Sequence, residues 1–152
     1  MSDLAQYLEE IVEPTIKDFE QNPTSRRHAF LACVAVCHGV DHLAYPDDPR
    51  TLRQQFEHQS QEFKIVNDVG HAFKHVVQGS PANPRMKASE VISRPPAHWG
   101  TAVWNISQDD RIGGVTLDSD HQVDLLAPVK AAVAFLWKQI KSQRVSPEPS
   151  AR

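Results

Sequence analysis

The sequence predicts a mainly α-helical (α+β) protein: a bundle of about four to five helices with a small antiparallel β-meander before the C-terminal helix. Apolar residues recur at helical spacing over most of 3–78 and again from about 126. The period changes to two, which is typical of strands, only at about 101–125. A chain of 152 residues with 40% hydrophobic and 23% charged residues is long and apolar enough to bury a core without disulfides or a metal.

The first helix is expected over about 3–21, where aliphatic and aromatic residues lie three or four positions apart. Pro14 falls inside this pattern. Because proline lacks the backbone N–H and its ring crowds the preceding turn, we expect a kink or two short helices there.

The second helix is expected to begin after Thr24 or Ser25, since either side chain can cap a helix, and to run to about Ala44. Its segment Ala29–Cys37 is apolar on every side, which predicts a central helix that is covered on several faces. Gly39 in the same helix would let a neighbouring element approach closely.

Two further helices are expected after the turn at residues 46–49. The first is short, over about 50–58. The second is long, from about 60 to 78, with an apolar stripe of phenylalanines and valines, and Gly79 is expected to end it.

Strands are expected in the region that precedes the last helix. Residues 81–96 contain four prolines and are interpreted as a loop with one strand at 89–93. A strand is predicted at 101–107, and a hairpin is predicted from 113–118 and 121–125.

The last helix is expected to begin near Ala127-Pro128, because proline is tolerated in the first turn. The apolar residues at helical spacing on its expected buried face are Leu126, Val129, Val133, Leu136, Trp137 and Ile140. The segment 144–152 is polar and contains prolines, so we expect a disordered tail there and a single domain over 1–143.

The charge and the apolar runs argue against several classes of protein. A net charge of −3 disfavours general nucleic-acid binding, which needs a basic face. The longest apolar run, Ala29–Cys37, is nine residues, about half of the roughly 20 that span a bilayer. Together with an N-terminus that lacks a basic and then apolar signal sequence, this favours a cytoplasmic protein without membrane contact.

The two cysteines, Cys33 and Cys37, lie four residues apart in the segment expected to be the central helix. Two thiols on adjacent turns of one rigid helix are poorly aimed for a disulfide. We therefore expect both to be reduced, buried and apolar in character, which agrees with a cytoplasmic location.

Histidine and aspartate recur at one-turn spacing in the second helix and in the later long helix, so that each helix carries a polar strip on one face. The residues are His38, Asp41 and His42 in the earlier helix and Asp68, His71 and His75 in the later one. Imidazoles one turn apart, completed by a carboxylate, suit zinc, iron or manganese, and bundles build such sites from facing helices.

The distance of each residue from the turn that connects the two helices reduces the number of these side chains that can share one metal ion. If the two helices are antiparallel neighbours, His42 lies about two residues from the connecting turn and His75 about sixteen, which separates them by about 20 Å. A metal site of His38, Asp68 and His71 is therefore easier to form, and the other members of the two strips are further candidates. The alternative is that the histidines are structural, in a non-enzymatic interaction module that could form a homodimer.

Arg53 and His58 have four residues between them, a spacing that resembles the arginine–histidine motif of the helical ribonucleases of the HEPN superfamily. The resemblance implies an RNA-acting protein, in which a cation and an acid/base meet a phosphodiester. Arg26 and Arg27 are interpreted as solvated charge at a helix start, and Lys74 is expected on a different helix face from His71.

The segments 27–46 and 68–76 resemble a set of small bacterial proteins that have no assigned activity. The likeness covers roughly the first half of the chain. It implies a bacterial origin and no particular chemistry.

Overall fold

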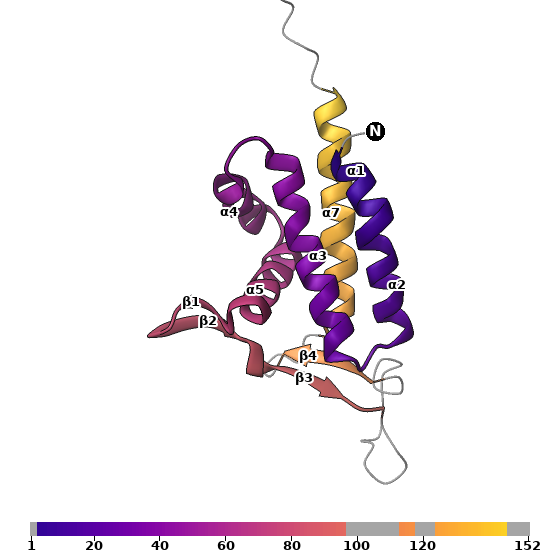
Figure 1. Cartoon of the computed structure of the whole chain (residues 1–152), viewed down its shortest axis with the longest axis vertical. Helices are drawn as coiled ribbons and strands as arrows, with labels where there is room; N and C mark the ends of the chain where they lie inside the picture. The colour runs from indigo at the N-terminus through magenta and orange to yellow at the C-terminus, as the bar shows by residue number, and fades with distance from the viewer. Residues whose placement is uncertain (1–2, 97–112, 118–123, 146–152) are drawn as a thin grey trace, which may run out of the picture.

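The structure is a computed structural model that describes residues 3–96, 113–117 and 124–145. Long helices lie side by side, and the strands lie at one end of them (Figure 1). The helical elements are α1 (Asp3–Tyr7), η1 (Leu8–Val12), α2 (Glu13–Gln21), α3 (Arg26–Ala44), α4 (Pro49–Gln59), α5 (Gln61–His75), η2 (Ala88–Glu90) and α7 (Leu126–Val145). The strands are β1 (Val77–Ser80), β2 (Asn83–Lys87), β3 (Val91–Arg94) and β4 (Gly114–Leu117). The predicted mainly α fold with a small antiparallel part before the last helix is confirmed.

The N-terminal helix changes its winding just before Pro14. α1 continues through η1, a π-helical turn, into α2, and the backbone N–H of Glu13 donates to the carbonyl of Leu8, five residues back. Proline cannot donate a backbone hydrogen bond, and its ring crowds the carbonyl four residues earlier. The wider π turn relieves this crowding, so the predicted disturbance at Pro14 is present as a π turn.

α3 is the central helix, as its apolar sequence predicts. The side chain of Ser25 caps it by accepting a hydrogen bond from the backbone N–H of His28, 3.3 Å away. The helix packs against α1, α2, α4, α5 and α7. A Cβ atom at Gly39 would stand 3.0 Å from a methyl group of Leu136 on α7, so the glycine does permit the close approach that was expected.

α5 ends three residues earlier than predicted. Val76 follows it with a positive φ of 71°, and Val77 and Gln78 then pair with β2 instead of extending the helix. The predicted role of Gly79 as the helix stop is therefore wrong: it lies in the β1–β2 hairpin with a φ of 94°. The two adjacent valines fit a helical stripe and a strand equally well, which explains the error.

The described strands form two separate antiparallel pairs, β1–β2 and β3–β4. The strands expected near 89–93 and 113–118 are present as β3 and β4, whereas the β1–β2 hairpin was not predicted. Its Pro84 pairs with Gly79 next to a β-bulge, a position where proline is tolerated. The strand predicted at 101–107 and the turn at 119–120 lie outside the described residues.

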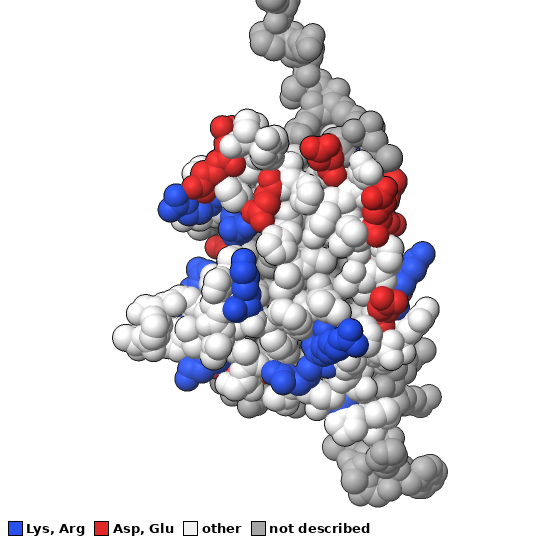
Figure 2. All heavy atoms as spheres, viewed as in Figure 1, with Lys and Arg blue, Asp and Glu red and all other residues white. Residues whose placement is uncertain are grey.

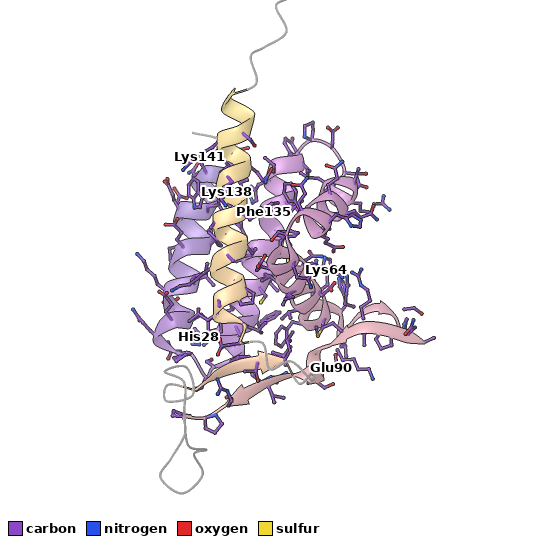
Figure 3. The ribbon with its side chains drawn as sticks, turned by 180° about the vertical axis from the view of Figure 1, so that it is seen from behind. His28, Lys64, Glu90, Phe135, Lys138 and Lys141 are labelled. Atoms are coloured by element: carbon purple, nitrogen blue, oxygen red, sulfur yellow. The ribbon has the colours of Figure 1, made fainter. Side chains whose placement is uncertain are left out.

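α7 closes the core on the face opposite to the viewer of Figure 1. Figure 3 shows Phe135 on the side of α7 that faces α5, and its ring packs against the rings of Phe56 and Phe63 at centroid distances of 5.0 and 6.0 Å. Trp137 is only partly buried, and its indole N–H donates to Glu13 at 3.1 Å. The helix continues to Val145, two residues beyond the expected boundary, and 146–152 lie outside the described residues.

Cys33 and Cys37 are both free and buried, as predicted. Among the described residues, no helix is long and apolar enough to cross a membrane.

Candidate functional site

A surface cavity of about 150 Å³ lies where α3, α4 and α5 meet. The side chains that line it include two cations, two imidazoles, a carboxylate and a thiol. The lining residues are Val34, Cys37, His38, Asp41, Arg53, Gly70, His71 and Lys74. The structure therefore brings His38 and His71, two of the three residues of the predicted metal site, to one cavity.

The carboxylate of Asp41 forms hydrogen bonds with two other residues that line the cavity, His38 and Arg53. One carboxylate oxygen lies 2.9 Å from Nδ1 of His38, and the other accepts a hydrogen bond of 2.8 Å from Arg53. Because a carboxylate only accepts, Nδ1 of His38 is the donor, and this leaves Nε2 as the nitrogen that is open to another partner. One residue thus orients both an imidazole and a guanidinium.

The guanidinium of Arg53 is not fully satisfied by Asp41. Its side chain is only 18% exposed, and its Nε–H is buried without a hydrogen-bond partner in the part of the chain that the structure describes. A buried donor without an acceptor is costly. Arg53 therefore keeps a donor that its pairing with Asp41 does not use.

α5 contributes His71 and Lys74 to the opposite wall. These residues are three apart, so they share a helix face, and the expectation that Lys74 lies on another face is wrong. Burial lowers the pKa of His71, and the nearby charges of Arg53, His75 and Lys74 lower it further. The ring of His71 also stacks on that of His75, at a centroid distance of 6.1 Å.

The floor of the cavity is formed where α3 and α5 approach each other most closely. A Cβ atom at Gly70 would lie 2.6 Å from the sulfur of Cys37 and 3.2 Å from the carbonyl oxygen of Cys33. The thiol of Cys37 points toward the carbonyl of Val66 at 3.6 Å, and burial raises its pKa to about 12. Cys37 is therefore a packing residue and not a nucleophile at neutral pH.

Asp68, the third member of the predicted metal site, does not line this cavity. Its carboxylate is 11% exposed and forms an ion pair of 2.8 Å with Arg85 on β2, which also lies 3.8 Å from Glu57. Among the described residues, no group of three histidine, cysteine, aspartate or glutamate side chains is arranged to hold a metal ion. The part of the chain that the structure describes therefore offers no ligand set for the zinc, iron or manganese hypothesis.

Three other candidate histidines, His42, His58 and His75, are not among the residues that line the cavity. His42 stacks on Tyr7 at a centroid distance of 4.2 Å, and His58 is exposed. Arg53 and His58, the pair that resembles the HEPN motif, are five residues apart on α4, which places them about 140° apart around the helix. Arg53 therefore shares the cavity with the imidazoles of His38 and His71 and not with that of His58.

The sequence did not predict that these residues would line one cavity. Arg53, Asp41 and His71 come from three different helices, and one-turn spacing reveals only pairs within one helix. The signal that was available is Lys74, three residues after His71, which belongs to the same face. No protein-family model, curated protein or solved structure matches the chain.

Proposed function

We propose that this cavity binds a small anion, or the carboxylate or phosphoryl end of a larger ligand. The observation that carries the proposal is the convergence of Arg53, Lys74, His38 and His71 on one small surface cavity. Its volume of about 150 Å³ is below the roughly 300–1,000 Å³ of pockets that enclose drug-sized ligands, so it suits a small group.

The charge of the lining favours an anion. Arg53 and Lys74 carry permanent positive charge, and both oxygens of Asp41, the one carboxylate among the described lining residues, already accept from Arg53 and His38. The side chain of Arg53 is mostly buried, at 18% exposed, so its charge is less screened by water than that of an exposed arginine. Arginine presents its donors in a planar fork that matches carboxylate and phosphate oxygens.

The same groups disfavour a divalent metal ion. Two fixed cations beside the imidazoles repel it, and Asp68, the carboxylate expected to complete the ligand set, is held by Arg85. Burial and these cations lower the pKa of His71. A bound anion would offset the effect of the cations.

The pairing of His38 with Asp41 adds the means to handle a proton. A carboxylate that accepts from Nδ1 fixes the tautomer and the orientation of the imidazole, and this directs Nε2 at a potential partner. Proton transfer to or from a bound oxyanion is the chemistry that this arrangement supports.

The test is stabilisation by a ligand that binds the folded state. Inorganic phosphate and acetate should raise the melting temperature by mass action, and Arg53→Gln and Lys74→Gln should each remove most of that gain. Arg50→Gln and Lys64→Gln are matched controls: each removes a cation from the same helix, and neither residue lines the cavity (Lys64 is labelled in Figure 3).

Phosphate also stabilises many proteins by exclusion from their surface, so the comparison between variants decides the result. An equal gain in wild type and in both cavity variants would overturn the proposal. Stabilisation by zinc that disappears in His38→Ala and His71→Ala, with none by phosphate or acetate, would favour the metal hypothesis instead.

A further inference from the structure

We infer that the ligand of this cavity is an amphiphilic anion: a straight-chain carboxylate of medium length, with its head in the cavity and its tail in an adjoining apolar groove. The inference rests on the proposed anion site. It adds the chemical class of the ligand, which the cavity alone does not define.

The groove is a second hollow of about 290 Å³, between the N-terminal helices and α3. Val34 and His38 line both the groove and the cavity, so the two hollows meet along one face of α3. A ligand whose head reaches Arg53 can therefore continue past His38 into the groove without leaving the protein surface.

The walls of the groove are apolar, although they are open to solvent. Ile11 and Leu31 line it, and they are 48% and 39% exposed, among the few large apolar side chains that the described surface leaves open. The polar groups between them are used internally: the hydroxyl of Tyr7 donates to Ala35 at 2.8 Å and that of Thr15 to Ile11 at 2.6 Å. Covering these side chains would remove apolar surface from water.

The view in Figure 2 agrees with this description. Uncharged residues cover the middle of this face, and charged side chains lie around it, including a group of Lys and Arg side chains over the lower end of α3. The uncharged area is thus bounded by charged side chains, which suits a narrow tail better than a broad protein partner.

The two ends of the groove differ in charge. α2 and α3 run in opposite directions (Figure 1), so Asp18 and His28 lie at one end of the groove and Tyr7 and His38 at the other. Among the residues that line the two hollows, the carboxylate of Asp18 lies at the first end and the guanidinium of Arg53 lies beyond the second, so an anionic head is directed toward Arg53. His28 and His38 are ten residues apart on α3, which gives the groove a length of about 15 Å.

The experiment compares the even-numbered carboxylates from acetate to decanoate, each below its micellar concentration, with imidazole NMR shifts as the readout for weak binding. Wild type should bind each longer acid more tightly, by about twofold to fourfold per methylene. Octan-1-ol, which has the tail of octanoate without the charge, should bind at least tenfold more weakly than octanoate.

Two sets of variants separate the head from the tail. Ile11→Ser/Leu31→Ser changes only exposed groove side chains, so it should keep acetate binding and lose most of the dependence on chain length. Lys74→Gln should weaken acetate and octanoate by a similar factor, and Lys64→Gln should weaken neither.

The outcomes distinguish the inference from the proposed function. If acetate binds and the longer acids bind no tighter, the anion site stands and the amphiphile is ruled out. If the long acids bind but are insensitive to Lys74→Gln, or if octan-1-ol binds as well as octanoate, the head is not in the cavity and the amphiphile inference fails. If acetate binding is also insensitive to Lys74→Gln, the proposed anion site fails with it.

Discussion

Asp41 determines the geometry of the candidate site at the scale of single residues. It holds a mostly buried guanidinium and an imidazole from two different helices with its two oxygens. A hydrogen bond between charged groups is stronger than one between neutral groups, and a buried charge that loses its partner keeps its desolvation cost. The effect of Asp41 should therefore be visible in stability as well as in binding.

Asp41→Asn should lower the free energy of unfolding by about 1–3 kcal/mol, because Arg53 would lose its charged acceptor. Urea denaturation measures this directly. In a double-mutant cycle, Arg53→Met should remove most of the effect of Asp41→Asn, since the variant has no guanidinium to leave unpaired. Additive effects of the two changes would show that the observed ion pair contributes nothing.

If the cavity binds an anion, His71 should make that binding dependent on pH. Its pKa lies below 6.5, so the folded protein resists its protonation, and the stability that this contributes is present above pH 6.5 and lost as the pH falls. Burial lowers the pKa of His71 most, Arg53, His75 and Lys74 lower it further, and Glu57 opposes them. A bound anion favours the protonated ring, so affinity should rise as the pH falls from 7.5 to 5.5. His71→Gln should flatten that part of the profile, and an unchanged profile in this variant would contradict the assignment.

At the scale of elements, the contact between α3 and α5 forms the floor of the cavity, and it depends on Gly70. Alanine at an exposed helix position would gain about 1 kcal/mol over glycine. Here the added methyl group would stand 2.6 Å from the sulfur of Cys37 and close to backbone atoms of Cys33, which cannot turn aside. Overpacking of this kind costs about 1–3 kcal/mol, which should exceed the free energy gained from the higher helix propensity of alanine.

Gly70→Ala should therefore destabilise the protein by about 1–2 kcal/mol and weaken anion binding, because α5 must shift away from α3. Gly39→Ala is the matched control: its Cβ would meet the end of the flexible Leu136 side chain at 3.0 Å, so its cost should be smaller. Thermal unfolding of both variants gives the comparison. Stabilisation by Gly70→Ala would mean that the helices are not in close contact there.

The helices were predictable from the sequence because their determinants are local: Ser25 before α3, Pro49 in the first turn of α4 and an apolar period near 3.6. The β1–β2 hairpin was not predictable, because prolines and a valine pair leave its pattern ambiguous. The cavity could be predicted only in part. Spacing within a helix pairs His38 with Asp41, whereas the position of Arg53 beside them depends on how α4 packs on α3.

At the scale of the whole molecule, arginines connect the strands to the helices. Arg26 at the start of α3 donates to the carbonyls of Val91 and Ala88, and its guanidinium lies 5.6 Å from the ring centroid of Phe73. Arg26 is exposed, as a solvated charge at a helix start would be, and it also connects α3 to the strand region. Arg85 on β2 makes a second connection, to Asp68 on α5.

Arg85→Ala should lower the free energy of unfolding by about 1–3 kcal/mol at pH 7, because it leaves the buried Asp68 carboxylate without its main counter-charge. Burial already raises the pKa of Asp68, so its charged form opposes folding, and the loss should shrink as the pH falls toward 4. Adding Asp68→Asn should restore most of the stability at pH 7. A loss that is independent of pH and not rescued would contradict this role.

The most direct test of the anion site is to follow the imidazole resonances of the histidines while phosphate is added at constant pH and ionic strength. Because His38 and His71 line the cavity, their signals should shift together with one dissociation constant, and the exposed His58 on α4 should not follow them. In Lys74→Gln the same curve should move to higher phosphate concentration. Shifts of equal size at His58, or none at His38 and His71, would contradict the proposal that this cavity binds anions.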